Sequence, residues 1–405
     1  MSLLGILLVV LFVVLMILRV PMAISCGAIT LLYLFLADTM ITPRDVVMSM
    51  FSAVNSFPLL AVPLFILAGQ FMATGGIAKY FLELADELVG NMKGGYALVA
   101  ILACLFFADL SGSAPATVAA IGTLMIPAMI KQGYNPAFAA GVCACAGVLG
   151  VIIPPSNPMI IYALTNNVSL GYLFLSGFIP GFVLVLGMAI PAYIISRKNG
   201  WGGSDRKRSF KRIMIALWRA KWALLVPVII LGGIYSGIFT PTESAAIACI
   251  YAAIVGLFVY KEFTWRDIPN IFKSAAVPVV TVFMILMFAS GLGVVMTMEG
   301  VPQALAESIG GITDNGALTM LIIIALLLFV GLFMDQMAAI IIISPLLLTI
   351  LAQYGVEPTH FGMIFIMALG IGFVTPPFGG NLFMANQISK LDIVKVFQAS
   401  IPLII

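Results

Sequence analysis

Two proline breaks lie within apolar segments of the chain and carry side chains that can bind ions. VIIPPSNPM covers Val151–Met159, and TPPFGGN covers Thr375–Asn381. Proline lacks an amide proton and pushes the preceding residue out of helical geometry, so carbonyls just before each break lose their helical partners. Freed carbonyls and side-chain oxygens suit a hard monovalent cation, and the helix that follows each break directs its positive end toward an anion. The breaks therefore predict a site for a cation beside an anionic group.

The oxygen ligands at the breaks can be named from the sequence. Near the first break these are Ser156 Oγ and the Asn157 amide oxygen. Near the second they are Thr375 Oγ and the carbonyls around Gly372 and Phe378. A single proline kink is commonly a packing feature, but a kink that recurs in two halves after a polar turn favours a binding site.

A polar turn precedes each break. The first, SGSAPA at Ser111–Ala116, supplies hydroxyls next to Asp109, and the second, at Met334–Met337, contains Asp335. A carboxylate in an uncharged membrane segment is functional by default, although an aspartate at a turn can also cap a helix. Both roles stay open for Asp109, whereas the functional role is favoured for Asp335.

The composition places these segments in a membrane. Of the 405 residues, 62% are hydrophobic and 9% are charged, against about a quarter charged in soluble domains. Three uncharged runs, 3–18, 223–239 and 318–334, reach or approach the roughly 20 residues that cross a bilayer. Strands of an outer-membrane barrel would alternate polar with apolar residues, and these runs do not. The fold class is therefore an all-α polytopic membrane protein. Its first run is a span and not a cleaved signal peptide, because Ile17–Pro21 is no small-residue cleavage site.

The sequence argues against a metal or redox cofactor and against ATP hydrolysis. Five cysteines lack CxxC spacing, His360 is the sole histidine, and no GxxxxGK[ST] loop occurs. A basic run between Arg197 and Lys221 holds nine basic residues and one acidic residue. By the positive-inside rule this run marks a cytoplasmic loop, and nucleic-acid binding is a poor alternative for a loop between two spans.

The chain is a tandem of two similar halves, 1–200 and 221–405, joined by the basic run. Seven residues, mostly glycine and proline, recur at an offset of 222: Gly133 and Gly355, Pro136 and Pro358, Gly150 and Gly372, Pro154 and Pro376, Pro155 and Pro377, Ala163 and Ala385, and Pro180 and Pro402. If the repeat is inverted, Arg19 must lie on the cytoplasmic side of the membrane, and its positive charge agrees with that side. A parallel repeat stays open. Because Pro402 matches a residue inside a span, we expect the last span to continue for about 20 residues.

Each half is predicted to contain the same series of elements. A re-entrant hairpin comes first, followed by a helix that ends at the proline break and by a second helix. The first half has hairpin arms at 95–110 and 117–131, a half-helix at 137–152 and a helix from Met159; the second has arms at 318–333 and 338–353, a half-helix at 361–374 and a helix from Leu382. Residues 77–88 carry four charges and suit the membrane interface, and 263–273 are their predicted counterpart.

Five segments resemble the signature segments of a known family: ADLSGSAPATVAAIGTLMIPAM, IIPPSNPMIIYA, GIYSGIFTPTESAAIA, GLFMDQMAAIIIISPLLL and GIGFVTPPFGGNLFMAN. The family is the large membrane (M) subunit of TRAP (tripartite ATP-independent periplasmic) transporters, of the ion transporter superfamily, and the resemblance covers essentially the whole chain. It implies two inverted repeats, each with a re-entrant helical hairpin and a broken transmembrane helix, arranged as an elevator with a scaffold and a transport domain. It also implies symport of sodium, at two sites, with an organic carboxylate such as a C4-dicarboxylate or a sialic acid, without enzyme activity or a further cofactor.

The resemblance further implies partners, a location and a division of the chain. A small four-helix membrane subunit would brace the scaffold, and a periplasmic substrate-binding protein would deliver the organic acid. The chain would be a multi-pass protein of the bacterial inner membrane, surrounded by the lipid bilayer and without nucleic-acid partners. The division is 1–94 (scaffold helices and interfacial arm), 95–170 (first hairpin and broken helix of the transport domain), 171–222 (scaffold helix and basic loop), 223–316 (scaffold helices and second interfacial arm), 317–392 (second hairpin and broken helix) and 393–405 (start of a final span).

Carried over residue by residue, the resemblance implies three binding sites. The first sodium site would consist of Ser111, Ser113, Gly150, Ser156 and Asn157, and the second of Gly331, Gly372, Thr375 and Phe378. The substrate would lie between the turns near Thr117, Asp335 and Asn381. We expect an apolar residue at the position of Asn157 in many relatives, so Asn157 serves either the ion or the substrate. No arginine lies near the turns, so helix ends, hydroxyls and bound sodium would attract the anion.

Three alternative functions stay open. The chain could be an autonomous divalent-anion symporter that needs no binding protein, or a passive channel. It could also be an intramembrane hydrolase that uses Ser111 or Ser113 with an aspartate, but no histidine or lysine lies near the turns to act as a base. The sequence leaves the identity of the organic acid open.

Overall fold

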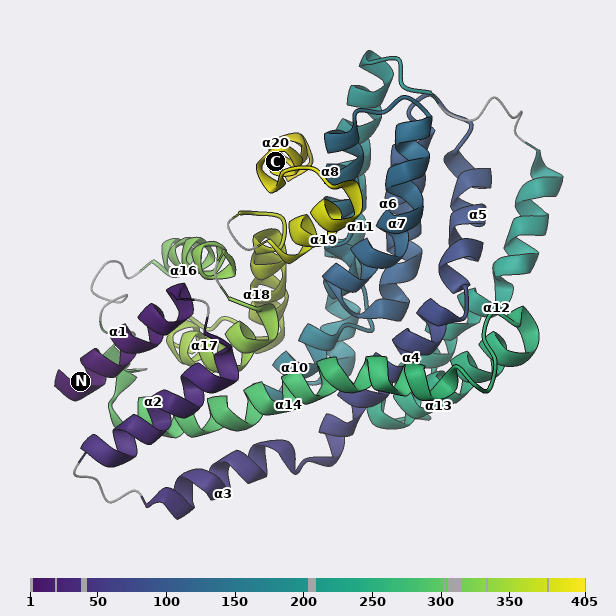
Figure 1. Cartoon of the computed structure of the whole chain (residues 1–405). Helices are drawn as coiled ribbons and strands as arrows, with labels where there is room; N and C mark the ends of the chain where they lie inside the picture. The colour runs from purple at the N-terminus through teal and green to yellow at the C-terminus, as the bar shows by residue number, and fades with distance from the viewer. Residues whose placement is uncertain are drawn as a thin grey trace.

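The structure, a computed structural model, describes residues 3–18, 20–37, 42–202, 209–301, 303–304, 307, 315–332, 334–376 and 379–404. All regular elements in these ranges are helices (Figure 1). Three residues with predicted roles, Arg19, Pro377 and Phe378, lie outside the described residues, as do 203–208 of the basic run.

The first half contains short helices, a hairpin and a broken helix. These are α1 (Leu3–Ile17), α2 (Met22–Leu36), α3 (Pro43–Val54), η1 (Phe57–Leu60), α4 (Ala61–Thr74), α5 (Ile77–Val89), the hairpin α6 (Gly95–Ser111) and α7 (Ala114–Lys131), the broken helix α8 (Pro136–Ala146), α9 (Leu149–Ile152) and α10 (Asn157–Thr165), and α11 (Leu170–Lys198). The predicted hairpin and break are confirmed. Helix α7 starts three residues earlier than predicted because Pro115 fits a first helical turn, where its missing amide proton is not needed.

The second half repeats the hairpin and the break. Its elements are α12 (Phe210–Tyr235), α13 (Pro241–Ile254), η2 (Val255–Tyr260), α14 (Ile268–Met298), the hairpin α16 (Gly316–Gly331) and α17 (Gln336–Ala352), the broken helix α18 (Pro358–Gly372) and α19 (Gly380–Ser389), and α20 (Ile393–Ile404). Residues 263–273 do not form a separate helix as residues 77–88 do. Residues from Ile268 onward belong to α14, because Pro269 fits its first turn and the helix continues through Pro278 to Met298.

Seven described helices are long and apolar enough to cross a membrane: Phe57–Thr74, Ala114–Lys131, Pro136–Thr165, Leu170–Lys198, Phe210–Tyr235, Pro241–Tyr260 and Ile268–Met298. The broken helix Pro136–Thr165 is the most enclosed, with 89% of its apolar window buried, compared with 28% for Phe210–Tyr235. A helix that buries all its faces belongs at the centre of a bundle. The first break therefore lies within protein, as irregular backbone at membrane depth requires.

The two broken helices run in opposite directions. The Tyr162 hydroxyl in α10 donates to the Pro358 carbonyl at 2.8 Å, so α18 begins beside the end of the first broken helix. Gly370, near the end of α18, lies against Val148, because a Cβ added to Gly370 would be 3.0 Å from Val148 Cγ1. The repeat is therefore inverted, and the parallel alternative is excluded.

The open end of the first hairpin lies beside the basic run. The Trp201 ring packs 5.2 Å from the Tyr134 ring and 5.1 Å from the Phe138 ring, and the Gly94 amide donates to the Trp201 carbonyl at 3.2 Å. Gly94 precedes α6, and Tyr134 precedes α8. Both the hairpin and the first broken helix therefore start on the side of the membrane that holds the basic run.

Candidate functional site

The first hairpin turn and the first proline break are in direct contact. Gly112 has a left-handed backbone (φ 55°) that favours glycine, and its carbonyl accepts a hydrogen bond from the Asn157 amide at 3.2 Å. A Cβ on Gly112 would lie 3.2 Å from the Pro155 carbonyl oxygen and 3.2 Å from Asn157 Nδ2. The structure thus brings the predicted ligand Asn157 to the turn through both its backbone and its side chain.

Three oxygen atoms converge inside this turn. Ser111 Oγ lies 2.5 Å from Thr117 Oγ1, and both hydroxyls are within hydrogen-bond distance of the Ser113 carbonyl, at 3.1 and 2.9 Å. Thr117 is fully buried. The sequence assigns Thr117 to the substrate, whereas its hydroxyl lies with two predicted sodium ligands. We call Ser111, Ser113 and Thr117 the turn cluster.

Gly150 places the broken helix directly against the turn cluster. A Cβ at this position would clash with Thr117 Oγ1 and would lie 2.7 Å from the Ser113 carbonyl oxygen, which is closer than real Cβ atoms approach. Ser156 is also buried, but its hydroxyl donates to the Val151 carbonyl at 2.6 Å and accepts a long bond from the Met159 amide. Ser156 therefore satisfies a carbonyl freed by the break and caps α10.

The second hairpin and the second break meet through two glycines. A Cβ on Gly372 would lie 2.5 Å from the Gly331 carbonyl oxygen, so α16 and α18 touch backbone to backbone. Thr375 follows in the break, where its hydroxyl donates to the Ile371 carbonyl at 2.9 Å and its amide to the Gly372 carbonyl at 3.1 Å. Three of the four residues predicted for the second sodium site are thus close together.

Asn381 and Asp335, two of the residues predicted to bind substrate, make different local contacts. Asn381 is fully buried, its Nδ2 donates to the Ala144 carbonyl at 2.8 Å, and its Oδ1 has no partner in the described part of the chain. A Cβ on Gly147 would be 3.1 Å from Asn381 Nδ2 and 3.2 Å from the Ala114 carbonyl oxygen. Asn381 therefore lies next to the start of α7, which begins at Ala114. Asp335 instead acts locally as the N-cap of α17, and its Oδ1 accepts from the Met337 amide at 2.9 Å.

Replacement of Asp335 tests its role as a cap. Asp335→Ala removes the acceptor and is expected to lower the free energy of unfolding by about 1 kcal/mol, whereas Asp335→Asn keeps a side-chain acceptor and is expected to stay near wild type. Thermal unfolding in detergent measures both variants. Equal destabilisation by Asn and Ala would contradict the cap.

Asp109 lies near the end of α6, where the first hairpin turn meets helices α4 and α12. Among the described residues, no backbone amide donates to its carboxylate, so the structure does not support the helix-cap alternative. It lines a small void of about 10 Å³ together with Ser111, Gly112, Pro155 and Asn157, and the opposite wall comes from α4 and α12: Phe65, Ala68, Met72 and Ile230. The turn therefore packs against helices that the sequence assigns to the scaffold.

A much larger cavity, of about 930 Å³, separates two groups of helices. Helices α10 and α17 form one wall, and α3, η1, α13 and α14 form the other. Hydroxyl groups come from both walls: Ser52, Ser56, Thr165, Thr240, Thr242, Ser290 and Thr297. No pattern in the sequence predicts this cavity, because these residues are scattered over many elements.

The position of this cavity along the membrane follows from α11 and α12. It is lined by Leu170, at the end of α11 remote from the basic run, and by Thr240, beyond the far end of α12. Helix α11 has 29 residues, which corresponds to about 43 Å. The cavity therefore lies on the side of the molecule opposite the basic run.

Comparisons with known proteins agree on one family. The family described as "Tripartite ATP-independent periplasmic transporter, DctM component" matches residues 9–405. The isethionate TRAP transporter permease protein DctMQ of Oleidesulfovibrio alaskensis is 44% identical over 97% of this chain and 62% of its own length. The C4-dicarboxylate TRAP transporter large permease protein DctM of Pseudomonas aeruginosa is 38% identical (93% and 87%), and the sialic acid TRAP transporter large permease protein SiaM of Vibrio cholerae is 35% identical (88% and 83%). This chain thus spans less than two thirds of the isethionate protein and most of the other two.

Two solved structures share the fold. The YdaH transporter of Alcanivorax borkumensis matches with a TM-score of 0.62 and 14% identity, over 96% of this chain and 94% of that one. MtrF of Neisseria gonorrhoeae matches with a TM-score of 0.61 and 13% identity, over 97% and 92%. At these identities the likeness concerns the fold alone.

Proposed function

Because the chain belongs to the DctM component family of the tripartite ATP-independent periplasmic transporters, we propose that it is the large permease subunit of a sodium-driven importer of a small organic anion. The relatives are named for isethionate, C4-dicarboxylates and sialic acid. These compounds share an anionic group, either a sulfonate or a carboxylate. Sodium symport suits anion uptake, because each cation that enters down 100 mV releases about 2.3 kcal/mol.

The turn cluster carries the proposal of a first sodium site. Its three oxygens lie within 2.5–3.1 Å of one another, and oxygen is the ligand that hard cations prefer. We assign the first ion to the turn cluster together with Asn157 and the backbone at Gly150. In this proposal Ser156 holds the break in shape and does not bind the ion directly.

A second sodium ion is proposed at the second break. The close approach of Gly331 and Gly372 leaves backbone carbonyls as the available ligands, and Thr375 adds a hydroxyl. The carbonyl of Phe378 completes the proposed set. Two sodium ions with one monocarboxylate move net positive charge inward, so the membrane potential and the sodium gradient both drive uptake.

We propose alternating access by an elevator motion of one group of helices against the other. The moving group would be α6–α11 and α16–α20, and the scaffold α1–α5 and α12–α14. Helix α11, at first grouped with the scaffold, is included in the moving group because it packs against α6, α8, α9, α10, α18 and α20. The large cavity lies along the boundary between the groups and would admit substrate from the external side.

The partners are proposed from the tripartite description of the family. A small membrane subunit would brace the scaffold, and a periplasmic protein would deliver the anion. The test uses proteoliposomes that contain this chain with both partners, and it measures uptake of the anion that the periplasmic protein binds. Uptake should require an inward sodium gradient, and equal uptake with potassium would contradict sodium coupling. Uptake by this chain alone would instead favour an autonomous symporter.

Removal of one hydroxyl tests the first sodium site. Thr117→Val deletes a proposed ligand while keeping the shape of the side chain, and we expect the sodium concentration for half-maximal uptake to rise about tenfold. Thr123→Val is the matched control, because Thr123 is an exposed residue of the same helix that donates only to the Ala120 carbonyl. A parallel rise in both variants, or in neither, would remove Thr117 from the site.

A further inference from the structure

A second cavity lies far from the hairpin turns, between α5, the first half of α12 and the end of η2. Its volume is about 390 Å³, and three cations and one carboxylate line it: Lys79, Arg219, Lys221 and Glu83. Aromatic rings from the same helices form much of the remaining wall. None of the residues assigned to sodium or substrate lines this cavity.

We propose that this cavity binds the phosphate head group of an anionic phospholipid in the cytoplasmic leaflet. The charges on its walls give a net charge of +2. The cytoplasmic leaflet is rich in anionic lipids, and basic pockets between membrane helices on that side suit their head groups. The inference is independent of the proposed transport function.

Lys221 is the cation best placed to meet a phosphate. Its Nζ lies 3.3 Å from the centre of the Trp218 ring and 5.0 Å from that of the Trp222 ring, which holds the ammonium group by cation–π attraction. In the described ranges, no carboxylate lies within 4.0 Å of it. Lys221 therefore brings to the cavity a positive charge that no carboxylate of the described residues pairs with directly.

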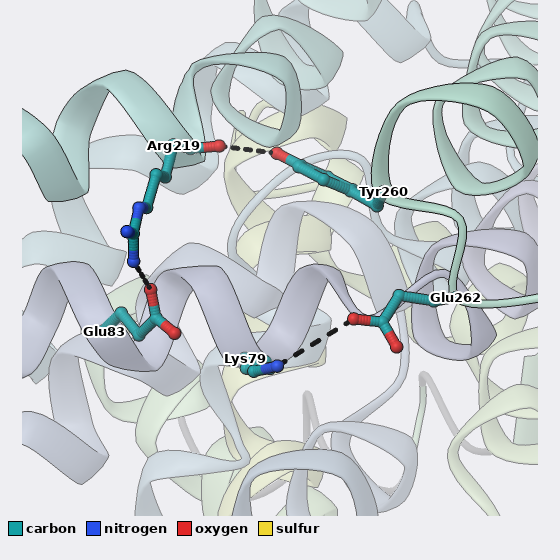
Figure 2. Close-up of polar contacts among 5 residues, drawn as sticks. All are labelled: Lys79, Glu83, Arg219, Tyr260 and Glu262. Carbon is teal, nitrogen blue, oxygen red and sulfur yellow. Dashed lines mark hydrogen bonds and ion pairs between the residues drawn. The ribbon is translucent and has the colours of Figure 1, made fainter.

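The other two cations are held by long ion pairs (Figure 2). Arg219 lies 3.7 Å from Glu83, and Lys79 lies 4.0 Å from Glu262. More than half of each cationic side chain is exposed, at 61% and 64%. Exposed ion pairs contribute little to stability, so a phosphate can share both cations without disrupting the fold.

Tyr260 fixes the geometry of this cavity. Its hydroxyl donates to the Arg219 carbonyl at 2.9 Å (Figure 2). Its ring stacks on the Tyr80 ring, with the ring centres 4.1 Å apart. The end of η2 is thereby held against both α12 and α5. The three cations consequently come from two helices that are tied to each other, so the cavity is formed before a ligand arrives.

The level of the cavity along α12 favours a lipid over a soluble phosphate compound. Its α12 residues lie in WRAKW, at the end of the basic run and directly before the uncharged stretch 223–239. Tryptophan rings gather at the head-group level of a bilayer, and Trp218 is 70% exposed. A head group in the cavity can therefore extend its acyl chains along the apolar surface of α12, which a soluble compound cannot use.

Native mass spectrometry of the purified whole chain tests the proposal. Phosphatidylglycerol, phosphatidylcholine and glycerol 3-phosphate are titrated separately. Lys221→Gln and Arg219→Gln should each weaken phosphatidylglycerol binding about fivefold and leave phosphatidylcholine binding unchanged. Arg219→Lys keeps the charge and should retain most of the binding.

Lys273→Gln is the matched control, because it removes an exposed positive charge from the first turns of α14, outside the cavity. The proposal would be overturned if Lys221→Gln and Arg219→Gln bound phosphatidylglycerol as tightly as Lys273→Gln binds it. Binding of glycerol 3-phosphate without binding of the lipid would also overturn it. The same variants are also measured in complex with the proposed small membrane subunit, and loss of that subunit with lipid binding intact would overturn the proposal and identify the cavity as a protein interface.

Discussion

Gly150→Ala is expected to abolish sodium-driven uptake while the protein still reaches the membrane. The new Cβ would lie 2.7 Å from the Ser113 carbonyl oxygen and would clash with Thr117 Oγ1. A backbone oxygen cannot rotate away, so the broken helix must separate from the turn cluster. Overpacking of this kind costs up to about 3 kcal/mol, which corresponds to about a hundredfold loss if it falls on ion binding.

The control for this variant is Gly187→Ala in α11. Nothing lies within 4 Å of a Cβ at Gly187, and alanine favours a helix over glycine, so uptake should remain at the wild-type level. A second measurement connects the loss to the ion: sodium should raise the thermal unfolding midpoint of Gly150→Ala less than that of Gly187→Ala, because only the second ion site remains intact. Sodium stabilisation of Gly150→Ala equal to that of the control would refute the first sodium site.

The equivalent change in the second half, Gly372→Ala, is expected to have a comparable effect. Its Cβ would lie 2.5 Å from the Gly331 carbonyl oxygen and 2.7 Å from Gly331 Cα, so α16 and α18 would have to separate. This would displace the carbonyls that we assign to the second ion, and uptake should again fall about a hundredfold. The measurement is initial uptake in proteoliposomes at several sodium concentrations.

Gly232→Ala in α12 is the control for Gly372→Ala, because a Cβ at Gly232 also meets nothing within 4 Å. Each steric variant should leave the opposite ion site intact. We therefore expect Gly372→Ala to retain part of the sodium-induced thermal stabilisation, contributed by the turn cluster. Complete retention of both stabilisation and uptake would exclude a second ion at Gly331 and Gly372.

The site was partly predictable from sequence because glycine and proline act locally. The repeat pairs Gly150 with Gly372, the resemblance assigns both to ion sites, and the structure places each of them against a hairpin. The role of Asp335 was harder to predict from the sequence. An aspartate in an apolar segment has the same sequence signature whether it binds a ligand or caps a helix, and only the position of the Met337 amide reveals the cap.

Thr117 shows a similar limit. It lies six residues beyond Ser111 along the chain, and their hydroxyls meet only because the turn at Gly112 reverses the backbone. The grouping of α11 with the hairpins and the large cavity likewise depend on contacts between distant segments. Such contacts leave no periodic pattern in the sequence.

By itself, the sequence determined that this protein is a membrane bundle of two similar halves, each interrupted at a proline break. Hydropathy, missing amide protons and glycine backbone freedom are properties of single residues and short segments, so they can be read directly. Three features become visible only in the folded chain: the halves run in opposite directions, particular residues complete the turn cluster, and Lys221 lines a cavity beside two tryptophans. These features depend on side-chain packing between helices distant in the chain, where close packing selects one arrangement among many that the same hydropathy pattern allows.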